Sequence, residues 1–440
     1  MWYKVLVLYT QEKKLSFFKT LRRDQKEAIG LLQIGTFLEY FDLMLYVHMA
    51  VLLNELFFPK TDQRTAALLS AFAFCSTYLF RPVGAMLFGY IGDQIGRKAS
   101  IIISTSMMAV SCFFMSILPT YEEIGIFASV AMITCRILQS FSATGEVIGA
   151  EIYLSEILEP PASYRIVSWV SELCTLGSLV ALLAASLIFK CGASWRAMFI
   201  LGGMIALSGA VARRKLRETP DFLKSRANKQ FTESKNTHVS RRTSLAYFFI
   251  YSGFPLCFYV IFIYCADILK YSMHYTAERI INHNLFLTIL SFTIGISIIF
   301  LSKKVHPLKI LRIRAILSSI VLFLIPFLPL TNIYALTSVQ VLLTIFTLGT
   351  LPAIPIFFKH FPVHRRFTYS SMLYAVSRAF MYVVTSFGLV YLTSALGPYG
   401  MWVIVLPVSV GFLWGVDHFA KLEEMKDKCV AVELAILKAA

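Results

Sequence analysis

Long apolar runs recur along the whole of this sequence, and they restrict the possible folds more than any other feature. A helix needs about 20 apolar residues to cross the hydrocarbon core of a membrane. Twelve runs of about that length lie near residues 28–53, 66–90, 99–119, 124–150, 164–189, 196–212, 244–269, 281–301, 310–330, 333–357, 368–394 and 400–418. The runs are continuous rather than alternating, which favours helices over the strands of a membrane β-barrel. We therefore predict an all-α membrane protein with twelve transmembrane helices in two six-helix bundles.

The composition agrees with a membrane protein. Of the 440 residues, 57% are hydrophobic and only 15% are charged, whereas soluble domains carry nearer a quarter of charged residues. The eight cysteines show no CxxC or metal-ligand spacing, so we interpret them as packing residues and expect no metal site. The first apolar patch is short and leads into Lys13 and Lys14 rather than a cleavage site, so we expect no signal peptide.

The distribution of basic residues predicts which side of the membrane each loop occupies. Counted on alternate sides of the twelve runs, 32 Lys and Arg lie on the side of the N-terminus and 6 lie on the other side. The positive-inside rule then places both termini and the central loop in the cytoplasm of a bacterial inner membrane. Since the net charge of +16 is concentrated in these loops, we expect the lipid bilayer rather than nucleic acid as a partner.

These segments divide the chain into five parts. They are a cytoplasmic basic tail (1–27), an N-terminal six-helix bundle (28–212), a cytoplasmic central loop (213–243), a C-terminal six-helix bundle (244–418) and a cytoplasmic tail (419–440). Two equal bundles are typical of transporters built from structural repeats. We expect the chain to function as a monomer.

The polar stretch between the second and third runs has the spacing Gly-x-x-Gly-Asp-x-x-Gly-Arg-Lys. Its six defining residues are Gly89, Gly92, Asp93, Gly96, Arg97 and Lys98. Glycines let two helix ends approach closely. Asp93 lies near the end of a helix, where a carboxylate is not favoured, so we expect its partner on another helix, across the interface between the halves. We interpret the stretch as a cytoplasmic gate.

Ionisable side chains within the apolar runs are costly in a membrane and are therefore candidates for function. In the first run, the carboxylates of Glu39 and Asp42 are three residues apart and share one helix face, next to Tyr40. Two such carboxylates cannot easily both ionise, which suits a proton carrier. Pairing with an arginine is the alternative. Arg81, in the second run, is either that partner or a ligand for a substrate carboxylate.

The fourth and fifth runs carry further charges. Gln139 and Glu146 are seven residues apart and share a face, as in a helix that lines a cavity. Arg136 is about 15 Å along the axis from Glu146, so we expect its partner on another helix. Trp169 and Glu172 lie on one side of the fifth run, where they would meet an ammonium group or form an interhelical contact.

The second half offers few buried charges. No Asp or Glu lies between Ile280 and Val416, and Asp267 is the only acid within a span of this half. If transport is driven by protons bound to carboxylates, we expect those carboxylates in the first half. Arg378 is the main buried charge that this half presents, and it suits a substrate carboxylate or an acid of the other half. No Walker loop, dinucleotide fingerprint, HExxH, GxSxG or potassium-filter sequence is present, so we predict neither an enzyme nor an ATP-driven pump.

Several of these motifs resemble those of the metabolite:proton symporters of the major facilitator superfamily. They are the 89–98 stretch, the Glu-aromatic-Phe-Asp run at 39–42, Arg81-Pro82-x-Gly84, Arg136-x-x-Gln139, Gly145-Glu146-x-x-Gly149-Ala150, Arg217-Glu218-Thr219-Pro220-Asp221-Phe222 and Phe361-Pro362-x-x-x-Arg366. Ser140 replaces the usual glycine after Gln139. Within this family the sequence is most similar to bacterial proline/betaine transporters.

The resemblance implies a secondary transporter that works by alternating access, driven by a proton gradient and without a cofactor. We expect symport of protons with a small zwitterion such as proline or glycine betaine. A di- or tricarboxylate such as 2-oxoglutarate or citrate is the alternative substrate, favoured if several arginines face the cavity unpaired. An alternative of another class is a transporter-like sensor that binds solute without moving it.

Overall fold

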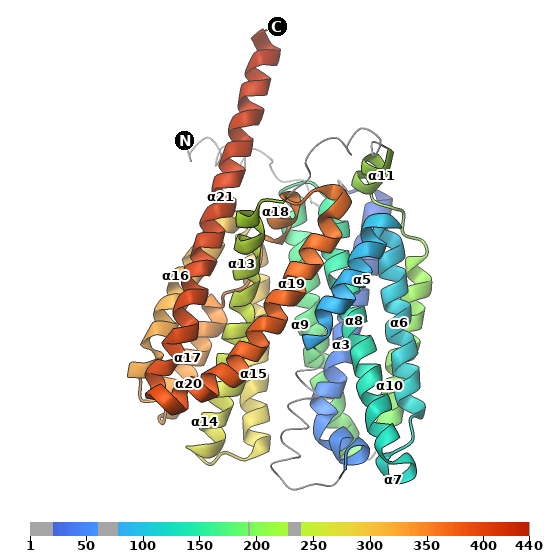
Figure 1. The fold of residues 1–440 in the computed structure, drawn as a ribbon, viewed down its shortest axis with the longest axis vertical. Helices are drawn as coiled ribbons and strands as arrows, with labels where there is room; N and C mark the ends of the chain where they lie inside the picture. The colour runs from blue at the N-terminus through green and yellow to red at the C-terminus, as the bar shows by residue number, and fades with distance from the viewer. Residues whose placement is uncertain (1–20, 60–77, 192–193, 228–238, 440) are drawn as a thin grey trace.

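The computed structural model describes residues 21–59, 78–191, 194–227 and 239–439, and the described chain is almost entirely helical (Figure 1). The helices of the first half are α3 (Arg23–Phe57), α5 (Arg81–Gln94), α6 (Arg97–Ile117), α7 (Tyr121–Ile124), α8 (Ile126–Ile157), α9 (Ala162–Cys191), α10 (Trp195–Arg213) and α11 (Pro220–Ala227). Those of the second half are α13 (Arg241–Tyr259), η1 (Val260–Tyr264), α14 (Cys265–Tyr271), α15 (Ala277–Leu301), α16 (Pro307–Leu324), η2 (Ile325–Phe327), α17 (Ile333–Phe346), α18 (Ile354–Lys359), η3 (Val363–Arg365), α19 (Arg366–Val383), η4 (Val384–Gly388), α20 (Leu389–Leu396), η5 (Gly397–Met401) and α21 (Trp402–Ala439).

The described helices account for a twelve-helix membrane fold. Eight helical stretches are long and apolar enough to cross a membrane, and one of them, Val363–Lys426, contains two successive spans joined by η5. The helices α3, α5 and α17 lie at the remaining predicted runs. Residues 66–77, the start of the second predicted run, lie outside the described residues.

Three elements depart from the simple picture of twelve uniform helices. The tenth predicted run is not one helix, because residues 347–353 are non-helical between α17 and α18. The seventh continues from α13 through the π-helical turn η1 into α14, with Pro255 inside α13. The twelfth, α21, does not stop at the membrane edge and runs on to Ala439 (Figure 1).

The two halves of the chain lie side by side and meet along a few helix pairs. In Figure 1 the helices α3, α6, α8 and α10 stand on one side and α13, α16, α17 and α21 on the other. The halves contact each other through α5 with α19, α8 with α18 and α19, and α9 with α15 and α18. The candidate site lies along these contacts.

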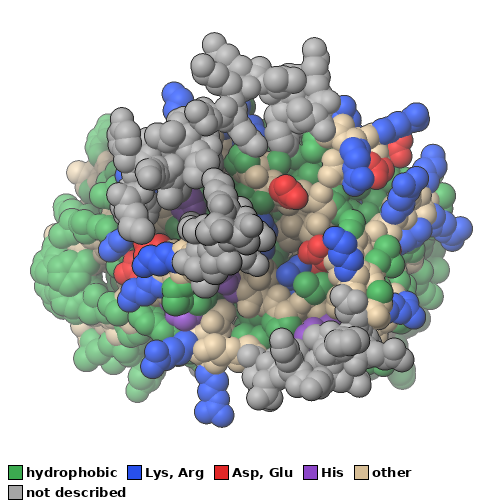
Figure 2. All heavy atoms as spheres, turned by 90° about the horizontal axis from the view of Figure 1, so that it is seen from above, with side chains coloured by type: hydrophobic (Ala, Val, Ile, Leu, Met, Phe, Trp, Pro, Cys, Tyr) green, Lys and Arg blue, Asp and Glu red, His purple; other side chains and the backbone are tan. Residues whose placement is uncertain are grey.

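The end of the molecule that carries α11, α18 and the outer part of α21 has many charged side chains. Figure 2 looks onto this end, where Lys and Arg side chains gather around the rim. We call it the basic side. It is the side on which the 95–96 turn, the 214–219 segment and the 360–365 segment connect helices (Figure 1).

Candidate functional site: an interhelical gate and a buried arginine–tyrosine cluster

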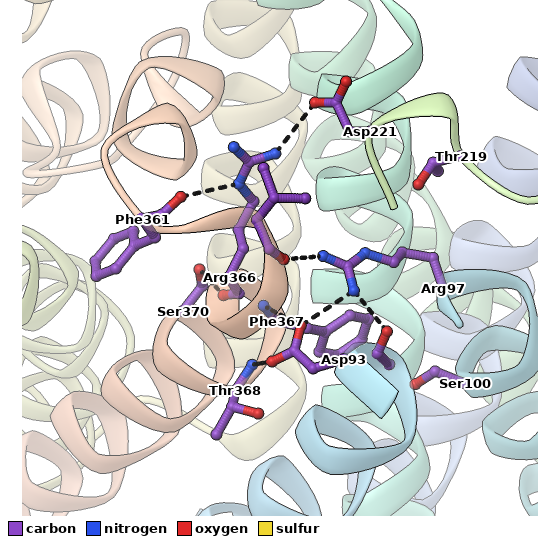
Figure 3. A network of polar contacts seen from close by, with 12 residues as sticks. Asp93, Arg97, Ser100, Thr219, Asp221, Phe361, Arg366, Phe367, Thr368 and Ser370 are labelled. Carbon is purple, nitrogen blue, oxygen red and sulfur yellow. Dashed lines mark hydrogen bonds and ion pairs between the residues drawn. The ribbon is translucent and has the colours of Figure 1, made fainter. Parts of the chain in front are cut away.

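Asp93 joins the two halves at the basic side. Its carboxylate accepts hydrogen bonds from the backbone N–H groups of Phe367 at 3.1 Å and Thr368 at 2.8 Å (Figure 3). These amides belong to the first turn of α19, which has no intrahelical acceptors for them. A carboxylate at a helix N-terminus is stabilised by the amides and by the helix dipole. The partner of Asp93 is therefore the backbone of a helix in the other half.

Arg97 and Glu156 extend this contact into a network. The Arg97 guanidinium donates to Asp93 Oδ1 at 3.1 Å and to Glu156 Oε1 at 3.3 Å, and its side chain is fully buried (Figure 3). Glu156, near the end of α8, also accepts a bond from Arg366 Nη1 at 3.0 Å, and Arg366 lies 3.5 Å from Asp221. We call Asp93, Arg97, Glu156, Asp221 and Arg366 the gate network.

Glycines make the close approach of α5 and α19 possible. A Cβ at Gly89 would lie 2.7 Å from the Cα of Thr368, and a Cβ at Gly92 would lie 2.5 Å from the ring of Phe367. Since real Cβ atoms do not approach other atoms so closely, any larger residue would push the two helices apart. The glycine spacing in the sequence is thus explained by contact with the other half.

Gly96 has a different role. Its φ of 144° lies outside the regions that L-residues prefer, and a Cβ there would overlap the carboxylate of Glu218. That carboxylate accepts the N–H groups of Arg97 at 3.0 Å and Lys98 at 3.2 Å, and so caps the start of α6. The segment that follows α10 is thereby fixed against the gate.

The closed gate places a carboxylate in a nearly dry environment. Asp93 lies beyond the predicted span 66–90, and its side chain is 3% exposed. Burial raises the pKa of its carboxyl, while Arg97 and the amides of Thr368 and Phe367 oppose that rise without cancelling it. The contacts therefore only partly offset the desolvation of this carboxylate.

A second charged group is buried inside the first half. Arg213, at the end of α10, forms an ion pair with Glu146 of α8 and donates to the hydroxyl of Thr105 on α6. Thr105 in turn donates to Glu146 at 3.0 Å. Both charged side chains are almost fully buried, so each needs the other.

Glu39 lies next to this ion pair but stands outside it. Both of its carboxylate oxygens are buried without a hydrogen-bond partner in the described part of the chain. Gly35, one turn earlier on α3, is in contact with the Arg213 guanidinium, and a Cβ there would overlap it. No ion pair joins Arg81 to Glu39 among the described residues, so Glu39 is not the partner of Arg81 that the sequence suggested. The Asp42 side chain lies outside the described residues.

Arg81 and Arg378 instead face a group of aromatic rings between the halves. The Arg81 guanidinium stacks 4.5 Å from the ring centre of Tyr78, and that of Arg378 lies 4.7 Å from Tyr374 and 4.8 Å from Phe254. The Nε atoms of both arginines are buried without a hydrogen-bond partner within the described chain. Neither arginine forms an ion pair with a described carboxylate.

The two arginines belong to one cluster that spans the interface. The rings of Tyr78 and Tyr382, one from each half, lie 4.1 Å apart. Tyr40 of α3 is within electrostatic range of both Arg81 and Arg378. We define the arginine–tyrosine cluster by its six members, Tyr40, Tyr78, Arg81, Tyr374, Arg378 and Tyr382.

The depth of the cluster follows from helix geometry. Arg81 is twelve residues from Asp93 on α5, and Arg378 is twelve residues from Arg366 on α19. At 1.5 Å per residue both lie about 18 Å below the gate network. Since the hydrocarbon core is about 30 Å thick, the cluster lies near the middle of the membrane.

The other predicted residues lie in helix contacts. Arg136 donates to Gln139 of its own helix at 2.8 Å, and Gln139 reaches Cys112 of α6 at 3.3 Å. Glu172 of α9 lies against Gly295 of α15, where a Cβ would overlap its carboxylate. Trp169 is half-buried on the same helix as Glu172.

Some important residues escape sequence reasoning. Arg314 lies near the start of the ninth run and was not singled out, yet in α16 it donates to the Leu351 carbonyl of the non-helical 347–353 segment at 3.3 Å. Backbone without helical bonds needs such a partner in a membrane. Arg213 and Glu156 lie at helix ends, where a charge is usually solvated. Their roles show only in the folded chain.

The fold and the sequence point to the same class of protein. Residues 30–247 match the family model described as "Sugar (and other) transporter". The structure of a proton:xylose symporter bound to 6-bromo-6-deoxy-D-glucose superposes with a TM-score of 0.75 at 14% identity, covering 90% of this chain and 95% of that one. The structure of a major facilitator superfamily transporter, FucP, in the outward conformation superposes with a TM-score of 0.68 at 14% identity, covering 90% of this chain and 99% of that one. The chain therefore has the fold of these major facilitator superfamily transporters.

Individual relatives are transporters of small solutes by name. The chain is 33% identical to a citrate-proton symporter of Klebsiella pneumoniae over 204 residues, which are 44% of this chain and 46% of the relative. It is 28% identical to the glycine betaine/proline/ectoine/pipecolic acid transporter OusA of Dickeya dadantii over 61% of this chain and 57% of the relative. A proline/betaine transporter of Escherichia coli K12 is 29% identical over 45% and 41%. The matches thus span about half the length of these relatives.

Proposed function

We propose that this chain is a proton-coupled secondary transporter for a small organic anion with two or more carboxylates. The observation that carries the proposal is the pair of arginines, Arg81 and Arg378, at the midplane between the halves with no carboxylate paired to either in the described chain. A guanidinium binds a carboxylate through two parallel hydrogen bonds. Two of them in one desolvated cluster suit a substrate with two such groups.

The surrounding aromatic rings support the same substrate class. A quaternary ammonium group is commonly bound against aromatic faces. In this cluster the faces of Tyr78, Tyr374 and Phe254 are already covered by the two guanidinium groups. An added cation would also meet like charge there, whereas an anion would be attracted.

The gate network supplies the conformational part of the function. It closes the basic side through contacts between α5, α8 and α19. In the proposed cycle the basic side is cytoplasmic, both termini lie in the cytoplasm of a bacterial inner membrane, and the monomer alternates between this state and one open to the cytoplasm.

A zwitterion such as proline or glycine betaine is the second candidate. It is favoured by the unpartnered carboxylate of Glu39 in the first half, which could receive an ammonium group. Glu39, Glu146 and Glu172 remain candidates for proton coupling, and Asp42 with them. A sensor that binds solute without transport is the candidate from another class.

The decisive experiment is uptake into proteoliposomes with an imposed pH gradient. Radiolabelled citrate, 2-oxoglutarate, proline and glycine betaine are offered singly and in competition. We expect gradient-driven accumulation of a carboxylate probe that proline does not displace. Uptake of all four probes that ignores the gradient would refute proton symport, and binding without counterflow exchange would identify a sensor.

A further inference from the structure

Glu151 is a buried carboxylate to which neither the gate network nor the arginine–tyrosine cluster assigns a role. It lies on α8 midway between Glu146 and Glu156, five residues from each, or about 8 Å along the helix axis. The residue is only 4% exposed. Its carboxylate accepts a bond from the hydroxyl of Ser171 at 3.3 Å and forms no ion pair with any residue that the structure describes.

The other half of the molecule faces this carboxylate. Tyr247 and Tyr251 of α13 and Arg378 of α19 are within electrostatic range of it. The rings of Tyr247 and Tyr251 lie 4.4 Å apart, and Tyr251 lies 5.3 Å from Tyr374, on which Arg378 stacks. Glu151 is therefore connected to the cluster through a continuous row of tyrosines.

The absence of an ion pair in the described chain separates it from Glu146 and Glu156. Glu146 is neutralised by Arg213, and Glu156 by Arg97 and Arg366. Among the described titratable groups, Tyr247, Tyr251, Cys174 and Arg378 interact electrostatically with Glu151. Cys174 is also within range of Glu39, Glu146 and Glu172, so the acids of the first half surround one small region.

A carboxylate that is dry and unpaired costs several kcal/mol to keep ionised, and the neutral acid avoids that cost. A neutral Glu151 keeps the bond that it accepts from Ser171, and its O–H group becomes a donor. We propose that Glu151 is the residue that carries the coupled proton across the cycle. This inference rests on the proposed function, because it assigns the proton site of that transport.

The proposed proton site binds a proton in one state of the transporter and releases it in the other. In the state with the basic side closed, one proton from the outer side is bound to the Glu151 carboxyl. When the gate network separates, Glu151 meets water on the basic side and transfers the proton to it. The resulting carboxylate is stabilised by Arg378, which the departed substrate has left free. One proton thus moves inward for each cycle, and Arg378 serves substrate and carboxylate in turn.

The test compares Glu151→Gln with Ser171→Ala in proteoliposomes, with potassium and valinomycin holding the membrane potential at zero. The probe is whichever of the four radiolabelled solutes wild type accumulates. With one coupled proton, a one-unit pH gradient raises a solute of fixed charge about tenfold inside the vesicle. Wild type that fails to accumulate any probe refutes the proposed function, whatever the variants do.

Given an active wild type, Glu151→Gln should keep counterflow exchange within about twofold, because exchange needs no net proton movement. Its accumulation ratio should fall to about one, and substrate should no longer carry protons inward, as read by an external pH electrode. Ser171→Ala keeps the acid and should keep accumulation. A Glu151→Gln variant that accumulates solute and moves protons as wild type does overturns the proposal.

A folding defect is controlled separately. If Glu151→Gln is not monodisperse in detergent, Glu151→Asp takes its place, since it keeps an acid but shortens its reach toward the tyrosines. That variant should retain proton-driven accumulation with a shifted pH profile of exchange. An unshifted profile overturns the proposal, as does loss of coupling in Glu39→Gln while Glu151→Gln stays coupled.

Discussion

Replacing Asp93 by Asn isolates the charge that holds the gate, at almost unchanged size. In the closed state Oδ1 accepts from Arg97 and Phe367, and Oδ2 accepts from Thr368. An asparagine oxygen can take over one side of this arrangement, but its NH₂ group then faces the N–H of Thr368, so two donors meet. The ion pair with Arg97 is lost as well.

The size of the effect follows from these contacts. A hydrogen bond to a charged group contributes about 1.5–3 kcal/mol, and leaving a buried donor unsatisfied adds to the loss. We expect Asp93→Asn to destabilise the closed state by about 3 kcal/mol. Since each 1.4 kcal/mol is about a tenfold change, the ratio of closed to open molecules should fall about a hundredfold.

The assay measures the distance between spin labels at Ile95 and Arg365, both exposed at the basic side, on an otherwise cysteine-free chain. The distribution should broaden toward longer distances in Asp93→Asn. Transport should be impaired while substrate binding remains. Asp417→Asn is the matched control, because Asp417 pairs with Arg312 at 3.6 Å in an exposed ion pair that contributes little. Wild-type distances and transport in Asp93→Asn would refute the gate.

Three further substitutions test the packing and the charges. Gly89→Ala should favour the open gate by about 1–3 kcal/mol, read by the same labels, whereas Gly30→Ala, with nothing within 4 Å of the new Cβ, should not; equal effects would contradict the contact. Arg213→Met should leave Glu146 buried and unpaired at a cost of about 3–5 kcal/mol, which lowers thermal stability in detergent. Adding Glu146→Met should restore part of that stability. An Arg213→Met variant as stable as wild type would exclude a stabilising ion pair. Arg378→Lys should raise KM for a carboxylate probe about tenfold by losing the planar fork, with kcat less affected; an unchanged KM would remove the arginine from the substrate site.

Much of the architecture is readable from hydropathy, because a membrane span needs length and apolarity that the sequence displays directly. The expectation that Asp93 has its partner on another helix, across the interface between the halves, is confirmed. What the sequence does not display is which atoms meet. The two carboxylate oxygens of Asp93 bind main-chain N–H groups of α19. Main-chain groups belong to every residue type, so no sequence motif reveals them.

The charge pairs show the same limit. From the sequence, Arg81 was a candidate partner for an acid of the first helix. The ion pair in the described chain is instead formed by Glu146, near the end of the fourth run, and Arg213, at the end of α10. Arg314 lies inside a span because the interruption at 347–353 needs a donor for the Leu351 carbonyl. Such pairings depend on helix rotation and depth, which hydropathy does not resolve.

The binding of Asp93 to main-chain N–H groups has a consequence for how this gate can vary between related proteins. Every residue except proline offers the same N–H group, so positions 367 and 368 are free to drift as far as the Asp93 contact is concerned, while position 93 is not. The contact therefore constrains the residue type at position 93 only. A survey of related sequences should therefore find proline excluded at 367 and 368 rather than one residue type favoured, and the Asp93 contact should leave no covarying pair.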